Sequence, residues 1–476
     1  MTSVIDLVDV VLALGRDNNE QVVLRGADLH IAPGESVLVS GLDSRARKAM
    51  MALLAGRTRP GYGQVLRGAP EAGNLTVLDG GDTVGHQALS GYRSIAGARR
   101  SVVVLAGSPT QSPTDYRWLE LTGGRFVPRP SGADAIRLTI AELRQRIVTE
   151  LRAAGAAETA AATVAEVIVD AERRGHRSHG VALVPTYLRR IASGGIDVTA
   201  TPVLTELGAT TATIDANGGL GQLAADAAAH WCATTASAYG LAAVAVRNNN
   251  HIGMLAAYRA PFQRHGVIGL LTNTSGPSVA PPGAQRPTLG SNALCLVTPT
   301  ASDTEPFCVD LATGVVAAGK IRDAANRGAI LPPGWLQDRH GKPSRNPADL
   351  DSGGAIPLFG GYKGLCVTLI VEVLAGILAG QRISPQVAKQ RKQPETTMGC
   401  SQMFIGFSAA HFGAEPADLV DDLIDQAQAA VLSGHDRPPA RPWFPDQMER
   451  DHTAQAERDG VTIPATVCAE LGWAVR

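Results

Sequence analysis

Hydrophobic and polar positions change their pattern near residue 130. Before that point, short runs rich in β-branched residues are separated by glycine and proline, which predicts strands joined by turns. The stretch FVPRPSGADA, residues 126–135, is interrupted by proline and rich in small residues, which is typical of a linker. We therefore expect a first domain at 1–130, a linker at 131–136 and a second domain at 137–476.

The second domain opens with a helical pattern. Thr139 and Glu142 have the spacing of a capping box, which predicts a helix start. The apolar residues that follow at helical spacing are Ile140, Leu143, Ile147 and Leu151. A second helix is expected at about 157–173.

Beyond residue 200, short apolar runs alternate with alanine-rich stretches. The runs LAAVAVRN, VIGLLTNT, ALCLVTPT and FCVDLAT end in polar residues, which is typical of buried strands whose ends carry chemistry. Between two such runs, GQLAADAAAHWCATTASAYG predicts a helix. The region is thus expected to be α/β (α+β).

The most apolar stretch is LCVTLIVEVLAGILAG, residues 365–380. It is short for a membrane span and carries Glu372 near its middle, so a buried core helix is the favoured interpretation.

Composition fits a globular chain of 476 residues with 45% hydrophobic and 18% charged residues. The formal net charge is -1, so no overall field attracts nucleic acid or an anionic membrane. Asp6 and Asp9 interrupt the segment where a signal peptide would need an apolar run. The six cysteines are scattered without a CxxC pair, which indicates a reducing compartment. We expect a cytoplasmic protein.

The first domain contains a strand–loop–helix pattern around SVLVSGLDSRARKAMMALLAG that resembles the phosphate loop of ABC transporter ATPases. Two loop glycines of that family become Ser44 and Ala46, the phosphate-binding lysine becomes Arg47, and the magnesium-binding hydroxyl becomes Lys48. The altered residues remove the flexible backbone and a metal ligand. We expect a degenerate, truncated relative that serves as a protein-interaction module. Residual nucleotide or anion binding through Arg45, Arg47 and Lys48 stays open.

The stretch ERRGHRSHGVALVPTYLRRIASGGI, residues 172–196, holds His176 and His179 three positions apart. Spacing alone leaves three interpretations open: metal ligands, an acid/base residue, or a polar turn. No nearby Cys, Asp or Glu completes a metal-ligand set with suitable spacing.

Seven motifs in order resolve this ambiguity by resemblance. The histidine stretch is followed by IDANGGLGQ, VAVRNNNHIGMLAAY, GLLTNTSGPSVAPPGAQRPTLGSNAL, VDLATGVVAAGKI, GWLQDRHGKPSRNP and IPLFGGYKGL. Together they cover nearly all of 137–476 and resemble the malate/L-lactate dehydrogenase superfamily, which includes piperideine/pyrroline-2-carboxylate reductases. The resemblance implies a non-Rossmann fold, a homodimer, and NAD or NADP as cofactor.

The same resemblance assigns roles to individual residues. His179 would be the catalytic acid/base, a task that suits an imidazole titrating near neutrality, with Ser178 and Asp310 as its relay partners. Lower-ranked substrate contacts are Thr272 and Asn273. The implied cofactor contacts are His251, Pro306, Phe307, Cys308, Val309, Leu311, Ala312, Tyr362 and Lys363.

Three positions depart from the family pattern. Leu183 stands where an arginine usually pairs with the substrate carboxylate, so the usual anchor for a 2-oxo acid is missing. Gly314 replaces a serine, and Asp446 replaces a glycine of a turn that helps hold the cofactor. Arg189 or Arg190 is an alternative anchor, although a solvated helix face is the simpler interpretation for both.

The sequence therefore predicts an NAD(P)H-dependent reductase that acts on a carbonyl or cyclic imine other than malate or lactate. Its partner would be a small molecule, with neither nucleic acid nor membrane involved. The alternatives are a catalytically impaired regulatory or scaffolding protein and an active ATPase.

Overall fold

The computed structural model describes residues 5–14, 21–31, 36–40, 44–54, 62–67, 75–84, 101–109, 117–122, 125–128, 136–301, 305–326, 330–414, 419–426 and 445–473. The chain divides into two compact units. The first comprises 1–137, 423–444 and 462–476, and the second comprises 138–422 and 445–461. Two C-terminal segments thus belong to the first unit, although the sequence pattern had placed them in the second domain.

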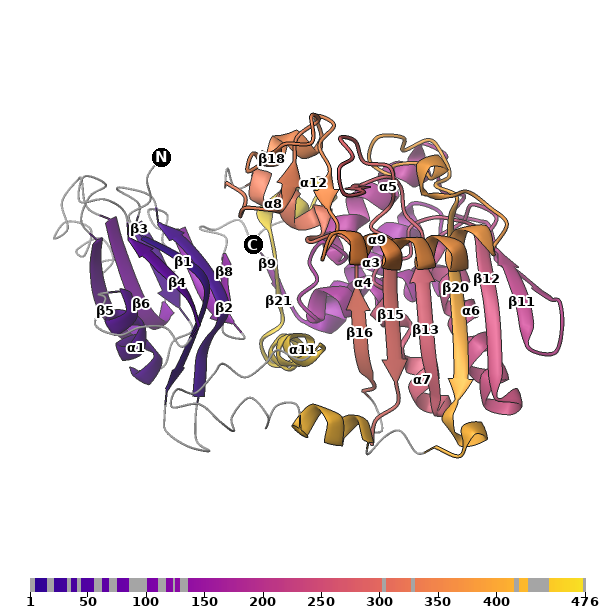
Figure 1. The fold of residues 1–476 in the computed structure, drawn as a ribbon, viewed down its shortest axis with the longest axis horizontal. Coiled ribbons are helices and arrows are strands. Elements are labelled where there is room, and N and C mark those ends of the chain that lie inside the picture. Colours follow the sequence, from indigo (N-terminus) through magenta and orange to yellow (C-terminus); the bar gives the residue numbers. More distant parts are fainter. Residues whose placement is uncertain are drawn as a thin grey trace. The chain divides into compact units, whose positions relative to one another are not determined.

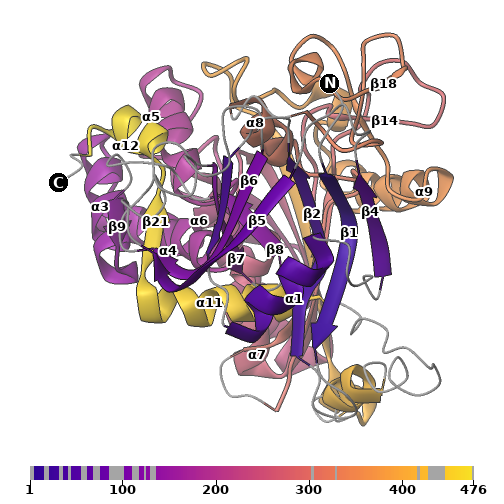
Figure 2. The same ribbon diagram turned by 90° about the vertical axis from the view of Figure 1, so that its left-hand side faces the viewer.

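The first unit contains two larger sheets among its described residues. One has the order β2-β1-β4 and the other β5-β6-β3-β7-β8. Helix α1 packs against strands of both sheets, as Figure 2 shows. The bounds are β1 (Ile5–Leu14), β2 (Gln21–Ile31), β3 (Ser36–Ser40), α1 (Ser44–Leu54), β4 (Tyr62–Arg67), β5 (Leu75–Val84), β6 (Ser101–Pro109), β7 (Arg117–Thr122), β8 (Arg125–Pro128), β9 (Ile136–Leu138), β21 (Val461–Ile463) and α12 (Ala465–Leu471).

The predicted strand–loop–helix of this unit is present as β3 followed by α1. Its connecting loop, 41–43, lies outside the described residues. Arg47 is buried and Lys48 is exposed. The predicted linker at 131–136 also lies outside the described residues except for Ile136, the first residue of β9. Residues 126–128, expected in a linker, are part of β8.

The second unit is built on a seven-stranded mixed sheet of described residues with the order β10-β11-β12-β20-β13-β15-β16. Strands β11 and β12 run parallel, and the other neighbouring pairs are antiparallel. The bounds are β10 (Val203–Glu206), β11 (Thr211–Asp215), β12 (Leu241–Asn249), β13 (Val267–Asn273), β15 (Ala293–Thr298), β16 (Phe307–Leu311) and β20 (Cys400–Ser408). Short two-stranded pairs are β14 (Val279–Ala280) with β19 (Ile356–Pro357) and β17 (Leu336–Gln337) with β18 (Pro343–Ser344).

The helices of this unit begin with the predicted pair. Thr139 caps α3 in a capping box with Glu142, as expected, and α4 follows one short turn later. The α-helices are α3 (Ile140–Ala153), α4 (Glu158–Arg173), α5 (Val184–Ala192), α6 (Gly221–Tyr239), α7 (Ala260–His265), α8 (Ala318–Asn326), α9 (Tyr362–Val371) and α11 (Gln447–Asp459), and another helix covers 419–426. Single turns are η2 (Val181–Leu183), η3 (Leu255–Tyr258), η4 (Pro347–Leu350), η6 (Ser384–Gln386) and η7 (Ala409–Phe412), and η5 (Glu372–Ile377) is a π-helix.

One face of the seven-stranded sheet is covered by helices along most of its strands. Helix α6 packs on β12 and β20, and α7 packs on β13. The alanines of α6 allow close approach, and the core between helix and sheet includes Val244, Leu271, Val297 and Phe404, none of them exposed. Cysteines 232, 295 and 308 are part of this core.

The opposite sheet face is only partly covered. Helix α9 and its π-helical continuation η5 cross this face, and η5 contacts β20 and β13 (Figure 1). The strands consequently alternate between buried and half-exposed residues, as in the burial pattern of β13, instead of being buried on both faces. The 365–380 stretch was predicted to be a buried core helix. It is helical, but its apolar side chains Leu369, Ile370, Val373, Ile377 and Leu378 are 46% to 65% exposed.

The interruption of α9 has a visible cause. Glu372 is 5% exposed and accepts hydrogen bonds from Asn292 Nδ2, Ser384 N and Ser384 Oγ. Burying a carboxylate requires such donors, and the helix widens into η5 at this residue. Among the described residues, no helix is long and apolar enough to span a bilayer.

Candidate active site

The two histidines of residues 172–196 separate in the structure. His176 Nε2 lies 3.1 Å from Glu449 Oε1 of α11. The His179 ring stacks on that of His251 with centroids 5.8 Å apart and planes inclined by 23°. Two motifs more than seventy positions apart in the chain therefore meet at one site, with His179 and His251 side by side.

The turn that carries His179 is held by buried polar contacts. Glu172, at the end of α4, is 5% exposed and accepts a hydrogen bond of 2.9 Å from Val181 N. Gly180 makes this possible, because a Cβ there would stand 2.0 Å from Glu172 Oε2. Burial raises the pKa of Glu172, and the Val181 hydrogen bond and the charge of Arg177 counteract part of that rise.

Ser178 orients His179. Ser178 Oγ lies 3.0 Å from His179 Nδ1, which leaves Nε2 as the other reactive nitrogen of the ring. The Ser178 side chain also packs against Gly319 at the start of α8, where a Cβ would meet Ser178 Cβ at 2.4 Å. Burial, with a smaller contribution from the neighbouring His176, lowers the pKa of His179 to about 4. His179 is therefore neutral in the free protein at neutral pH.

Asp310 has a different contact from the predicted one. Its Oδ2 accepts a hydrogen bond of 2.9 Å from Ala256 N, and no hydrogen bond between Asp310 and His179 occurs among the described residues. Asp310 lies on β16, the edge strand of the sheet, and its side chain is exposed. The structure thus pairs His179 with Ser178 and ties Asp310 to the backbone after the His251 loop.

The NNNHIG loop positions His251 through its asparagines. Asn249 Nδ2 donates to Gln402 Oε1 at 2.8 Å, and Asn250 Nδ2 donates to the carbonyl oxygens of Gly218 and Gly219. Both asparagines are at most 1% exposed. The polar residues of this motif are therefore structural and fix the backbone on which His251 stands.

The predicted cofactor segment 306–312 lies along the free edge of the sheet. Among the described residues, strand β16 pairs with β15 alone, so its other edge presents backbone N–H and C=O groups that suit a carboxamide. Cys308 is 3% exposed and its side chain is in the core, so only its backbone faces that edge. Pro306 accepts a hydrogen bond of 3.3 Å from Arg450 Nη2 through its carbonyl oxygen.

The GGYKG turn lies next to the end of β16. Phe359 N donates to Thr313 O at 3.1 Å, and Gly314 forms a bridge with Leu358. Gly360 and Gly361 have φ of 55° and 58°, a region that favours glycine, and no side chain caps the start of α9. Tyr362 and Lys363 are both exposed there. An uncapped helix start with an adjacent lysine suits a phosphate group.

The predicted substrate residues divide into two groups. Thr272 is 0% exposed and donates to Met403 O at 3.2 Å, so its side chain does not reach the site. Asn273 is half-buried and its Oδ1 accepts from Gln402 Nε2 at 2.7 Å. Leu183 lies in η2, one turn after His179, and is 3% exposed.

The two arginines considered as substitutes for an anchor also differ. Arg189 is exposed, as expected for a helix face. Arg190 is 0% exposed, so the solvated-face interpretation is wrong for it. Its Nη2 donates to Gly195 O, Asn250 Oδ1 and Thr396 O, because these loops fold over the end of α5 and take the guanidinium out of water.

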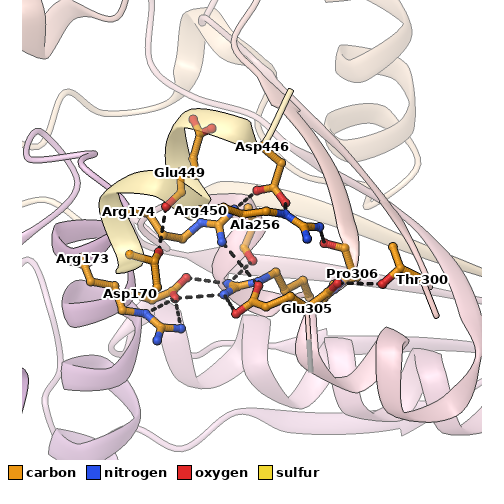
Figure 3. A network of polar contacts seen from close by, with 12 residues as sticks. Asp170, Arg173, Arg174, Ala256, Thr300, Glu305, Pro306, Asp446, Glu449 and Arg450 are labelled. Atoms are coloured by element: carbon orange, nitrogen blue, oxygen red, sulfur yellow. Dashed lines mark hydrogen bonds and ion pairs between the residues drawn. The ribbon is translucent and has the colours of Figure 1, made fainter. Parts of the chain in front are cut away.

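Asp446 takes part in a buried ion-pair network (Figure 3). Its φ is 74°, a left-handed conformation that glycine adopts freely and that aspartate tolerates better than most residues, which fits the glycine that the resemblance implies for this turn. Its carboxylate pairs with Arg174 and lies 3.1 Å from Arg450 Nε. In the same network Arg259 Nη1 lies 2.6 Å from Asp170 Oδ2 and Nε lies 3.2 Å from Glu305 Oε2. The network joins α4 to the segment before α11.

The site also contains residues that the sequence reasoning did not single out. Tyr187 and Gln222 are each 1% exposed, and the Tyr187 hydroxyl lies 2.8 Å from His251 Nδ1. Both residues lie inside motifs already quoted, eight positions after His179 and in IDANGGLGQ. Their polarity in otherwise apolar surroundings was the available signal.

Comparison with known proteins identifies the family to which this chain is similar. The profile of the family described as malate/L-lactate dehydrogenase matches residues 138–472. The chain is 34% identical over 335 residues to Delta(1)-pyrroline-2-carboxylate/Delta(1)-piperideine-2-carboxylate reductase of Pseudomonas putida, covering 70% of this chain and 95% of that protein. It is 32% identical to a malate dehydrogenase of Pyrococcus abyssi over 58% of this chain and 77% of the relative.

A solved structure is similar as well. The delta1-piperideine-2-carboxylate reductase of Pseudomonas syringae pvar. tomato superposes with a TM-score of 0.64 at 29% identity, covering 72% of this chain and all of the other. These matches fall on the part of the chain that contains the site.

Proposed function

This chain belongs to the malate/L-lactate dehydrogenase family, whose members are NAD(P)-dependent oxidoreductases acting on hydroxy or imine groups, and from that premise we propose that His179 is its proton donor. The proposed reaction is reduction of a carbonyl or a cyclic imine by NADH or NADPH. The observation that carries the proposal is the pairing of His179 with Ser178 on one side and with the His251 ring on the other.

The chemistry follows from the state of this imidazole. A bound nicotinamide would supply hydride to the substrate carbon, which leaves negative charge on the substrate oxygen or raises the basicity of its nitrogen. The His179 imidazolium gives up a proton to that atom and returns to the neutral form that the site favours. A low pKa makes the His179 imidazolium a stronger acid, but it also lowers the fraction of His179 that is protonated. Positioned acid/base groups typically raise the rate of such a step about 10²–10⁴-fold.

The residues that would hold the cofactor fit its parts. The open edge of β16 offers backbone groups for the carboxamide, and the GGYKG turn with Lys363 offers a helix start and a cation for phosphate. The two lie together because Phe359 N donates to Thr313 O. His251 would contact substrate or cofactor beside them.

The substrate is proposed to differ from malate and lactate. Leu183 is buried where a relative's arginine would pair with a carboxylate, and Arg190 is bound by three backbone and side-chain oxygens. Leu183 carries no guanidinium, and the Arg190 side chain is 0% exposed, so neither position presents an accessible guanidinium to a 2-oxo acid. Larger ketones, 2-oxo amides and cyclic ketimines fit such a pocket better, and a panel of cyclic imines is suggested by the substrate in the name of the Pseudomonas putida relative.

The test is turnover with and without His179. Purified protein is incubated with NADH or NADPH and a panel of 2-oxo acids, 2-oxo amides and cyclic imines. We expect His179→Gln to lose at least about 10²-fold in kcat while cofactor fluorescence titration gives an unchanged Kd. Unchanged kcat in that variant removes the proposed role, and absence of cofactor binding in the parent favours a regulatory or scaffolding protein.

We further propose a homodimer. The half-covered face of the sheet and the exposed side of α9 and η5 form one apolar surface, and Leu296 of β15 is 38% exposed on it. Exposed apolar area of this extent is typical of a surface that another chain covers. A second copy fits because an isologous contact lets the same apolar face cover itself.

The N-terminal unit is proposed to be a non-catalytic interaction module. It retains a strand followed by a helix, but Lys48 stands where a magnesium-binding hydroxyl is needed and is exposed. The expected result is no magnesium-dependent ATP hydrolysis. A cytoplasmic location is proposed from the six free cysteines.

A further inference from the structure

His251 receives hydrogen bonds at one ring nitrogen from two groups. Gly253 N lies 3.2 Å from His251 Nδ1, and the Tyr187 hydroxyl lies 2.8 Å from the same atom. A backbone N–H can only donate, so Nδ1 must carry a lone pair. In a neutral imidazole the proton is then on Nε2.

Tyr187 is itself oriented by a donor. Gln222 Nε2 donates to the Tyr187 oxygen at 3.0 Å. The hydroxyl has a single proton, and with its oxygen accepting from Gln222 that proton is directed to His251 Nδ1. Burial raises the pKa of Tyr187, so the proton stays on the oxygen at any ordinary pH.

His179 contrasts with His251 in this respect. The partner of His179 Nδ1 is the Ser178 hydroxyl, which can donate or accept and so tolerates either protonation state of the ring. The partners of His251 Nδ1 tolerate only the state in which that nitrogen carries no proton. Two stacked imidazoles 5.8 Å apart would also repel each other if both were charged.

We propose that Tyr187 is a positioning residue that fixes His251 as the Nε2–H tautomer, so that His251 is a permanently neutral hydrogen-bond donor in the site while His179 alone changes protonation. The part of this inference that concerns catalysis rests on the proposed function, whereas the tautomer assignment does not. A fixed neutral donor suits a carbonyl or imine substituent oxygen, and it cannot compete with His179 for the transferred proton.

The charges around His251 point in the same direction. Burial, with smaller contributions from the charges of His179, Arg190 and Arg391, lowers the pKa of His251 to about 3. None of these groups is an anion that would favour an imidazolium. The surroundings of His251 thus support the neutral form that the hydrogen bonds select.

The tautomer is measured directly on the full chain. ¹⁵N-histidine labelling and long-range ¹H–¹⁵N spectra, assigned with His251→Asn, report which ring nitrogen is protonated between about pH 4 and pH 8, a range that reaches a His251 pKa raised by one unit from about 3. We expect an Nε2–H signature for His251 throughout. In Tyr187→Phe we expect a measurable fraction of the other tautomer and a His251 pKa raised by roughly one unit, since one donor to Nδ1 is lost.

Tyr258→Phe is the matched control. Tyr258 is also buried, and its hydroxyl donates to Ile252 O rather than to His251, so this variant should keep the wild-type His251 spectrum. A protonated Nδ1 in the wild type, or an identical His251 spectrum in Tyr187→Phe, would overturn the proposal. If Tyr187→Phe does not fold, the wild-type spectrum still decides.

Kinetics separates this proposal from the proposed function. For an active substrate, the pH profile of kcat/KM should show one ionisation in the wild type and a second one in Tyr187→Phe, a change that mere loss of packing would not produce. Full activity in His179→Gln together with the expected His251 spectrum would refute the proton-donor role and leave the tautomer assignment intact.

Discussion

At the scale of single residues, the site is governed by where water is excluded. His179 is only partly buried, yet its surroundings lower its pKa to about 4 because a neutral ring is easier to desolvate than a charged one. Ser178 gives the ring its orientation without fixing its charge. The imidazole can therefore both lose and regain a proton during turnover.

The lowered pKa of His179 predicts a pH dependence of stability. The unfolded chain takes up a proton at the ordinary value near 6.5, whereas the folded protein does so only near 4. Stability should therefore be unaffected by this group above about pH 6.5 and should fall as the pH drops from there toward 4. Urea unfolding of the wild type and His179→Gln at pH 7 and pH 5 checks this. The wild type should lose more stability on acidification, and equal losses would contradict the shift.

Leu183 predicts a change in substrate preference. Leu183→Arg places a guanidinium one helical turn from His179, where it can pair with a carboxylate. A charge-assisted pair is worth about 1.5–3 kcal/mol, so kcat/KM for a 2-oxo acid should rise roughly 10- to 100-fold. Leu183→Met is the control of similar volume and should bring no gain. Steady-state kinetics on both variants decides, and a folded Leu183→Arg without improvement would show that Leu183 does not face the substrate.

At the scale of elements, the sequence pattern predicted those helices and strands that are formed mainly by interactions between residues close in the chain. The capping box of Thr139 and Glu142 and the periodic apolar residues after it predicted α3, and the apolar runs predicted β12, β13, β15 and β16. The surroundings of single side chains could not be predicted in this way. Arg190 is buried because distant loops supply its acceptors, and Thr272 is inaccessible because β20 supplies Met403 O.

The same limit applies to the site itself. The resemblance predicted site roles for His179, Ser178 and His251. In the structure His179 contacts both Ser178 and His251. It also named Asp310 as a partner of His179, whereas the carboxylate accepts from Ala256 N in the structure. Tyr187 emerged only from the hydrogen-bond geometry at His251. Residue type and spacing indicate that chemistry is present, and the partner of each atom depends on contacts far apart in the chain.

The start of α8 predicts a sensitive packing contact. Gly319→Ala would place a Cβ 2.4 Å from Ser178 Cβ, so the serine or the helix must move. Because Ser178 orients His179, we expect kcat to fall about tenfold or more, with a stability loss of about 1–3 kcal/mol for the crowded contact. Gly208→Ala is the control, since its nearest neighbour is the end of the Thr211 side chain at 3.1 Å. Thermal unfolding and kcat of both variants test this. An unaffected kcat in Gly319→Ala would show that the packing of α8 against Ser178 does not influence His179.

At the scale of the whole molecule, the two faces of the seven-stranded sheet differ. One face packs on a hydrophobic core, whereas the other keeps apolar side chains in contact with water. Cysteines, valines and phenylalanine fill the side under α6 and α7, whereas η5 covers only part of the opposite face. Apolar surface left in water favours association by about 25 cal/mol per Å². The exposed side of α9 and η5 is therefore the surface on which we propose that a second copy of the chain packs.

That explanation makes a prediction about the oligomer. Ile370 is 57% exposed on α9, so Ile370→Glu should leave the fold of one chain intact and place a charge in the proposed contact. Light scattering after size exclusion should give a dimer for the wild type and a monomer for the variant. Leu207→Glu is the control, because Leu207 is 67% exposed in the turn between β10 and β11, away from α9, and should stay dimeric. A wild-type protein that is monomeric at micromolar concentration would contradict the proposed dimer. Loss of the dimer with unchanged turnover would show that the site of one chain, with His179 and His251 from that chain, is complete by itself.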